Sequence, residues 1–177
     1  MVSAAPAVDV LQGVVMFTDI VGFTEYTALQ GDAQALKLLS LQERVVHEAL
    51  PPGARLVKEL GDGLLLWFPE ACAAVECALA LQARFERESY ESMLPLWVRM
   101  GMHWGRQTPR RDDIVGHDVN VASRIVNVAG PGEVLVSEAT VAEIGRTAVN
   151  AMFEPIGPVI MKGIPDPIRL YRAVPSI

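Results

Sequence analysis

Six polar residues in three short segments have the chemistry needed for metal-dependent reactions of a nucleotide. The segments are FTDIVGFT at residues 17–24, VKELGD at 57–62 and DDIVGHDVNVASR at 112–124, and each adjoins an apolar run. The six residues are Asp19, Lys58, Asp62, Asp113, Asn120 and Arg124. Carboxylates bind hard divalent cations, while the cationic and polar side chains can bind phosphate and select a base. This combination predicts a site for metal ions and a nucleotide.

The two acids Asp19 and Asp62 are expected to lie close together. Asp19 follows a predicted buried strand at residues 13–18, and Asp62 precedes a predicted strand at 64–68. If these strands are antiparallel neighbours, the end of one lies beside the start of the other. Close carboxylates repel each other unless cations lie between them, which favours two Mg²⁺ or Mn²⁺ ions roughly 3.5–4 Å apart. The alternative is that Asp19 caps the next helix and Asp62 only occupies a turn.

Asn120 and Arg124 lie four residues apart in a predicted helix at 116–129, so they share one face of it. Arginine can stabilise charge on a pentavalent phosphorus, and asparagine can orient a ribose oxygen. The alternative is an arginine that faces water. A Gly-containing loop at residues 20–24 also leads into a helix. Its backbone N–H groups are suited to holding a triphosphate.

Lys58 and Asp113 have the donor and acceptor character that would select adenine. Lys58 lies four residues before Asp62 in a predicted hairpin, where a lysine is most often a solvated edge residue. It could instead donate to a base nitrogen while Asp113 accepts from an exocyclic amine. Guanine carries an oxygen where adenine carries that amine, so the pair would favour adenine.

A mixed α+β fold is predicted to position these residues. Apolar runs and helix breakers indicate strands at residues 13–18, 55–59, 64–68 and 96–102, and helices at 33–50 and 69–87. A turn at residues 61–63 joins the second and third strands as a hairpin. The order βαββαβ is the ferredoxin-like arrangement. The predicted C-terminal additions are a helix at 116–129, a strand at 133–136, a short helix capped by Ser137, and strands near 153–161 and 168–173.

The composition fits one globular domain. Of 177 residues, 51% are hydrophobic and 20% are charged, and the net charge is -6. This acidic balance argues against nucleic-acid binding, which requires a basic surface, and no apolar run reaches the ~20 residues of a membrane span. We therefore expect a cytoplasmic domain at residues 13–177, with residues 1–12 as a linker at its edge. This is compatible with regulatory domains, or a membrane tether, in a longer native chain.

Taken together, the three segments resemble the signatures of the class III nucleotide cyclase catalytic domain, most closely those of bacterial adenylate cyclases. FTDIVGFT, the pattern K-x-x-G-D at residues 58–62 and D-x-x-G-x-x-V-N-V-A-S-R at 113–124 occur in the family's order. KGIPDPIRLYR at residues 162–172 is similar to the family's C-terminal strand pair. The resemblance covers residues 14–172, which is nearly the whole chain.

The resemblance implies a role for each site residue. Asp19, Asp62 and the backbone carbonyl of Ile20 would bind two divalent cations. The residues implied to contact ATP are Lys58 and Asp113 at adenine, Asn120 at the ribose, Arg124 at the transition state, Lys162 at the phosphates, and Phe23 and Thr24. The family's sites lie at the interface of a dimer. A homodimer is therefore implied, in which one chain supplies the two acids and its partner supplies the selector, asparagine and arginine side chains.

The implied activity is that of an adenylate cyclase, which converts ATP to 3′,5′-cyclic AMP and pyrophosphate. A guanylate cyclase is the near alternative, against which Lys58 and Asp113 argue. A catalytically silent nucleotide-binding or dimerisation module is another, although such a module would be expected to lack one of the six residues. The segment 105–113 is shorter than the arm that helps to clasp mammalian dimers, which bears on dimer strength. Asp112 adjoins Asp113, and the spacing to Gly116 favours Asp113 as the selector.

Overall fold

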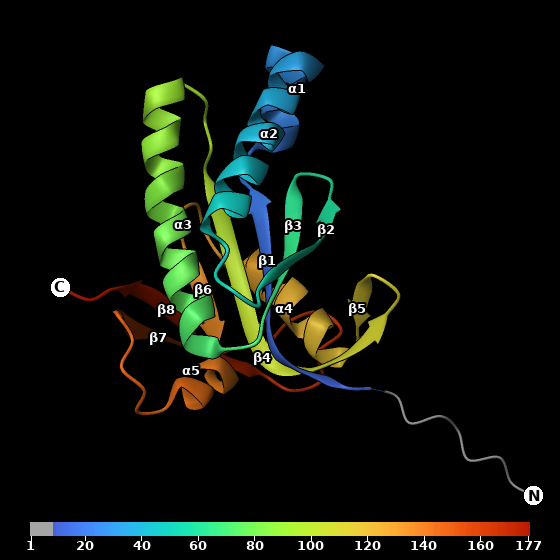
Figure 1. Cartoon of the computed structure of the whole chain (residues 1–177), viewed down its shortest axis with the longest axis vertical. Helices are drawn as coiled ribbons and strands as arrows, with labels where there is room; N and C mark the ends of the chain where they lie inside the picture. The colour runs from blue at the N-terminus through green and yellow to red at the C-terminus, as the bar shows by residue number, and fades with distance from the viewer. Residues whose placement is uncertain (1–8) are drawn as a thin grey trace, which may run out of the picture.

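A computed structural model describes residues 9–177 of the chain as a single mixed sheet with helices on both faces (Figure 1). In chain order its elements are β1 (Leu11–Ile20), α1 (Phe23–Gln30), α2 (Asp32–Ala49), β2 (Arg55–Leu60), β3 (Gly63–Phe68), α3 (Ala71–Ser92), β4 (Val98–Arg110), β5 (Asp113–Val115), α4 (His117–Val128), β6 (Val134–Ser137), α5 (Glu138–Ile144), β7 (Ala151–Val159) and β8 (Ile168–Pro175).

The strands follow the order β2-β3-β1-β4-β6-β8-β7, and β5 pairs with β4. β1 is the central strand of the N-terminal part and is antiparallel to both β3 and β4. β6 pairs with β4 in parallel. Beyond β6, β8 pairs antiparallel with β6, and β7 pairs antiparallel with β8. The predicted ferredoxin-like βαββαβ core with a helix and strands added at the C-terminus is confirmed.

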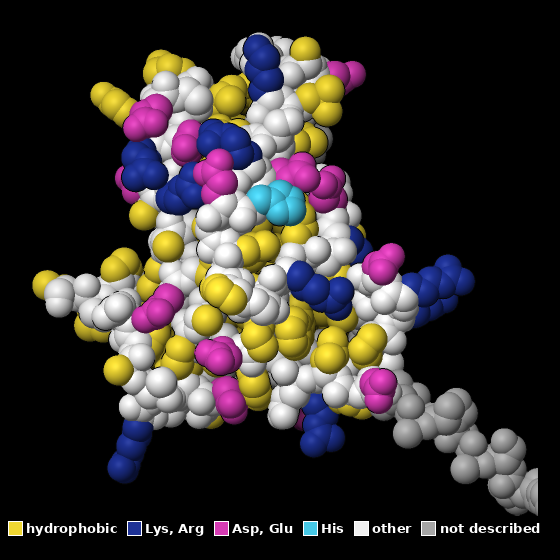
Figure 2. Space-filling model, viewed as in Figure 1, with side chains coloured by type: hydrophobic (Ala, Val, Ile, Leu, Met, Phe, Trp, Pro, Cys, Tyr) yellow, Lys and Arg dark blue, Asp and Glu magenta, His cyan; other side chains and the backbone are white. Residues whose placement is uncertain are grey.

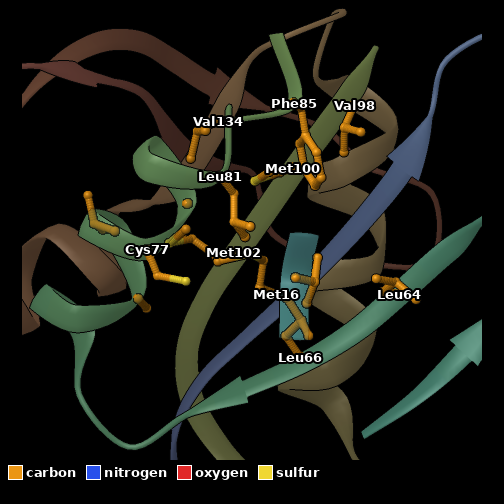
Figure 3. Packing of buried hydrophobic residues seen from close by; sticks show 14 of the residues in the cluster. Met16, Leu64, Leu66, Cys77, Leu81, Phe85, Val98, Met100, Met102 and Val134 are labelled. Carbon is orange, nitrogen blue, oxygen red and sulfur yellow. The ribbon is translucent and has the colours of Figure 1, made fainter. Parts of the chain in front are cut away.

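The larger core lies between the sheet and the helices α2 and α3. Alternate side chains of a strand point to opposite faces, so Met16 of β1, Leu66 of β3 and Met100 of β4 point to the same side. Figure 3 shows these side chains packed with Leu81 and Phe85 of α3, and all five are at most 1% exposed. Burial of this face accounts for the apolar residues at alternate positions of these strands.

A smaller core lies on the opposite face of the sheet, under α4 and β5. Val15 of β1 and Leu65 of β3 point to this side and pack with Ile114, Val119 and Ala122. β1 is therefore buried on both faces. Side chains that α4 turns away from this core, such as Asn120, remain exposed.

The main differences from the sequence-based predictions are at β1, α1 and β4. β1 begins at Leu11, inside the predicted linker, and it includes Asp19, because its ladder with β4 runs from Leu11 to Ile20. Residues 1–8 of that linker lie outside the described residues. The predicted loop at residues 20–24 contains the start of α1. β4 continues to Arg110, after which the polypeptide turns back to form β5. The short segment 105–113 is thus mostly the arm of a β-hairpin.

Acidic and basic side chains are interspersed over α2 and α3 on the face seen in Figure 2. Arg44 pairs there with Glu48 at 3.5 Å and with Glu88 at 3.2 Å. Such exposed pairs contribute little to stability. Among the described helices, none combines the length and the apolar composition of a membrane-spanning helix.

Candidate active site

Asp19 and Asp62 meet where β1 ends and β3 begins. Asp19 pairs in register with Gly63, the residue after Asp62. Partial burial, followed by the negative charge of Asp19, raises the pKa of the Asp62 carboxyl from 3.8 to about 6. The two acids therefore lie together, as the strand order predicts. Asp19 does not cap the next helix, because the N-cap of α1 is Gly22 and no side chain caps it.

Arg99, which the sequence analysis did not identify, is bound to Asp19. It lies opposite Asp19 in the β1–β4 ladder, and its Nη2 and Nε atoms donate to Asp19 Oδ2 at 2.6 and 2.8 Å. Its Nη1 atom donates to the backbone oxygen of Asn127 in α4 at 3.3 Å. Arg99 therefore joins one acid of the pair to the C-terminal end of α4.

A buried contact from α2 positions Asp62. Gln42 is 1% exposed, and its Nε2 atom donates to the backbone oxygen of Asp62 at 3.2 Å. The Thr18 hydroxyl donates to Gln42 Oε1 at 3.4 Å and accepts from the backbone N–H of Leu64 at 3.1 Å. A Cβ at Gly63 would lie only 2.4 Å from the backbone oxygen of Thr18, so this close approach requires glycine. The turn that carries Asp62 is thus fixed from two sides.

The two acids fit a divalent-cation site. The described residues contain no group of three or more His, Cys, Asp or Glu side chains that could hold a metal, so the side-chain donors here are two carboxylates. Burial and the charge of Asp19 raise the pKa of Asp62, and the charge of Arg99 opposes them with a smaller effect. Carboxylate oxygens, with a backbone oxygen such as that of Ile20, are donors that Mg²⁺ and Mn²⁺ accept.

The N-terminus of α1 lies next to the acids along the chain. Gly22 adopts a left-handed conformation with φ of 71°, which glycine accepts without strain. The helix starts at Phe23, and Tyr26 is the first residue whose N–H bonds back, to the Gly22 oxygen at 2.9 Å. The N–H groups of Phe23, Thr24 and the next residue have no acceptor within the helix. This end of α1 therefore favours an anionic ligand.

Lys58 and Asp113 form an ion pair, although they lie 55 residues apart in the chain. Lys58 Nζ donates to Asp113 Oδ2 at 2.7 Å, and the backbone N–H of Ile114 donates to Asp113 Oδ1 at 2.7 Å. The hydrogen bond from Lys58 is the largest cause of the lowered pKa of Asp113. Both oxygens of this carboxylate are thus oriented, whereas the adjacent Asp112 is exposed. The β4–β5 hairpin makes this contact by folding back toward β2.

Asn120 and Arg124 lie on α4, as predicted. The helix rests closely on β4, since a Cβ at Gly101 would lie 2.3 Å from the backbone nitrogen of Val126. Asn120 is exposed and Arg124 is partly exposed. Within residues 9–177 neither side chain has a hydrogen-bond or ion-pair partner. Both are therefore available to a ligand or to another chain.

Lys162 is not brought to the other predicted residues within one chain. It is exposed in the connection between β7 and β8. β8 is four strands from β3 in the sheet, which corresponds to about 19 Å at the usual strand spacing. A lysine side chain cannot span this distance to Asp62. A common site for Lys162 and Asp62 would require two chains.

A sequence model described as the adenylate and guanylate cyclase catalytic domain matches residues 9–173. Curated relatives include the serine/threonine-protein kinase pkn2 of Myxococcus xanthus, 32% identical over 161 residues, and an adenylate cyclase of Streptomyces coelicolor, 35% identical over 132 residues. The alignments cover 89% and 74% of this chain but 19% and 34% of those proteins. The solved structure of the adenylyl cyclase CyaB from P. aeruginosa is similar, with a TM-score of 0.84, 26% identity and 96% coverage of both chains.

Proposed function

We propose that this chain, which belongs to the adenylate and guanylate cyclase catalytic domain family, is an adenylate cyclase. In the proposed reaction the ribose 3′-hydroxyl of ATP attacks the α-phosphorus in line. The O3′–P bond forms while the bond from the α-phosphorus to pyrophosphate breaks, and the hydroxyl proton is released. The products are 3′,5′-cyclic AMP and pyrophosphate. The choice of ATP rests on the Lys58–Asp113 ion pair, whose atoms lie 2.7 Å apart.

At the base, Lys58 would donate to an adenine ring nitrogen while Asp113 accepts from the exocyclic amine. Guanine would place its oxygen against the carboxylate, so that two acceptors would face each other with no proton between them. The hydrogen bonds from Lys58 and from the Ile114 N–H orient this carboxylate before any ligand arrives. Such preorganisation reduces the entropic cost of selecting a base.

At the triphosphate, Asp19, Asp62 and the Ile20 carbonyl would hold two divalent cations, Mg²⁺ or Mn²⁺. These ions would supply the positive charge that lowers the pKa of the 3′-hydroxyl and neutralises the phosphates. The free N–H groups of Phe23 and Thr24 would donate to phosphate oxygens. Gln42 would keep Asp62 in place through its backbone, since the two groups are already bonded at 3.2 Å.

On α4, Asn120 would orient the ribose and Arg124 would stabilise the charge that develops on the phosphorus. The absence of partners for these side chains within residues 9–177 supports this role, because a side chain already bonded within the chain would not be free to bind a ligand. Lys162 would contribute positive charge to the phosphates. These assignments follow the family's pattern, residue by residue.

We further propose that each site is shared between two copies of the chain. One copy would provide Asp19 and Asp62, and the other would provide Lys58, Asp113 and α4. For Lys162, the separation of about 19 Å between β3 and β8 supports a site made by two copies. It would allow Lys162 to act only on the site that contains the partner's acids. An isologous homodimer would contain two such sites.

Product analysis of the purified chain tests the proposed function. The chain is incubated with ATP or with GTP in the presence of Mn²⁺, and cyclic AMP and cyclic GMP are quantified. We expect cyclic AMP to exceed cyclic GMP by at least about tenfold, as a polar mismatch at the base predicts. Predominant cyclic GMP would identify a guanylate cyclase instead. No cyclic product at any protein concentration would identify a silent module.

A further inference from the structure

A continuous chain of hydrogen bonds joins β4 to the ends of β6, α5 and α4, outside the residues discussed above. Its members are the backbone N–H of Trp104 and the side chains of Thr140, Ser137, His103 and Asp118. The successive distances are 3.0, 3.1, 2.7 and 3.3 Å. The second oxygen of Asp118 accepts from the backbone N–H of Arg106 at 2.7 Å. Both ends of this hydrogen-bond network are therefore anchored on β4.

The Asp118 carboxylate can only accept, so His103 Nε2 must carry a proton and donate to it. At the other ring nitrogen, a neutral imidazole requires the Ser137 hydroxyl to donate to His103 Nδ1. Nδ1 is then an acceptor, and the proton of a neutral imidazole lies on Nε2, where it donates to Asp118. Burial lowers the pKa of His103, against the opposing effect of Asp118, which agrees with a neutral ring at pH 7.

Asp118 lies in the first turn of α4 and is pressed against β4. A Cβ at Gly105 would lie 2.1 Å from Asp118 Oδ2, so the carboxylate occupies space that only glycine leaves open. Near the other end of the helix, Gly101 makes the similar close contact with Val126. α4 is therefore seated on β4 at two points eight residues apart. Asn120 and Arg124 lie between these points.

The Asp118–His103–Ser137 arrangement has the residue types of a hydrolytic triad, but its geometry excludes that function. Ser137 is 0% exposed and also caps α5 by accepting from the Thr140 N–H at 3.4 Å. A nucleophile must reach its substrate, and this hydroxyl cannot. The role of this hydrogen-bond network is therefore structural and not hydrolytic.

We infer that Asp118 is a positioning residue: it fixes the Nε2–H tautomer of His103 and clamps the first turn of α4, and thereby sets the orientation of Asn120 and Arg124. The catalytic part of this inference rests on the proposed cyclase function. The evidence for the clamp itself is independent of that function. It consists of the hydrogen bonds of Asp118 with His103 and Arg106 and its close approach to Gly105. It connects a buried polar network to the helix that carries two proposed active-site side chains.

Nitrogen-15 NMR of the imidazole tests the clamp without any assay of activity. In the wild type, His103 is expected as the neutral Nε2–H tautomer near pH 7. In Asp118→Asn the amide oxygen is expected to accept from the Arg106 N–H and the amide NH₂ to face His103, which then takes the Nδ1–H form. An imidazolium or an Nδ1–H ring in the wild type would overturn the inference. So would an unchanged Nε2–H ring in the variant.

Steady-state kinetics test the consequence for catalysis. Small misplacements of catalytic groups can cost up to about 100-fold in rate, so we expect Asp118→Asn to lower kcat at least about tenfold and to change the KM for ATP less than about threefold. Asp32→Asn, an exposed acid in the first turn of α2, is the control and should match the wild type. Unaltered kcat in a variant with wild-type thermal stability would overturn the inference.

Two further outcomes are separable from these. If Asp118→Asn does not fold, Asp118→Ser also removes the carboxylate, and it must show the same loss of kcat. If the wild type forms no cyclic nucleotide, the proposed function fails, whereas the His103 tautomer in the wild type and the variant still decides whether Asp118 is a clamp.

Discussion

Replacing Lys58 by methionine would test base recognition with a minimal change of shape. Methionine keeps the unbranched apolar stem and most of the length of the side chain but removes the donor that binds Asp113 at 2.7 Å. The Ile114 N–H would still hold the other Asp113 oxygen, also at 2.7 Å. The variant therefore removes one proposed contact with adenine and loosens a second. It leaves Asp19 and Asp62 untouched.

The expected loss can be estimated from the geometry. A hydrogen bond to a charged group contributes about 1.5–3 kcal/mol, and each 1.4 kcal/mol corresponds to a factor of about ten. The side chains of Lys58 and Asp113 are 39% and 34% exposed, and solvent screening favours the lower end of the range. We therefore expect kcat/KM for ATP to fall about 10–30-fold, and the pKa of Asp113 to rise toward its ordinary value.

The assay is cyclic AMP formation over a range of ATP concentrations, with GTP measured in parallel. Lys37→Met is the matched control, because Lys37 is an exposed lysine on α2 without an ion-pair partner among residues 9–177. The control should keep wild-type kcat/KM. If Lys58→Met also keeps wild-type kcat/KM for ATP and the same preference over GTP, Lys58 does not read the base and the reasoning is refuted.

Three other outcomes are expected. Asp19→Ala and Asp62→Ala should each lower cyclic AMP formation at least about 100-fold, and near-normal turnover by either variant would exclude the metal role of that acid. Lys58→Glu combined with Asp113→Cys should raise the relative use of GTP, as measured by the ratio of the two cyclic products; an unchanged ATP preference would contradict this. In metal-free protein the folded-state pKa of Asp62, about 6, lies above its unfolded value, so the free energy of unfolding should fall as the pH rises from about 4 to 6. Denaturant titrations should show a shallower fall for Asp62→Asn, and identical slopes would refute the shifted pKa.

The sheet order and the meeting of the acids could be predicted because their signals are local. The apolar runs around residues 13–18 and 64–68 identify buried strands, and Gly61 and Asp62 identify the turn before the second of them. Once the order βαββαβ is accepted, antiparallel pairing brings Asp19 next to that turn. No contact far apart in the sequence had to be known in advance.

The residues that were missed act through contacts that a single sequence does not display. Arg99 interrupts an apolar strand as any outward-facing side chain might, and its partner Asp19 is 80 residues away. α1 has no buried residue, so it lacks the apolar periodicity that identifies a helix. Gln42 did leave a signal, because it falls between Leu38 and Val46 on the buried stripe of α2. A polar residue on such a stripe requires a buried partner.

The shared active site is tested most directly by mixing two inactive variants, Asp19→Ala and Arg124→Ala. A mixed dimer would place both lesions in one site and leave its other site intact. With equal amounts and random pairing, about half of the dimers are mixed and each has one intact site of two, so activity should recover to about a quarter of wild type. Each variant alone should be nearly inactive. A mixture that forms no cyclic AMP at concentrations where the wild type is dimeric and active would contradict the shared site.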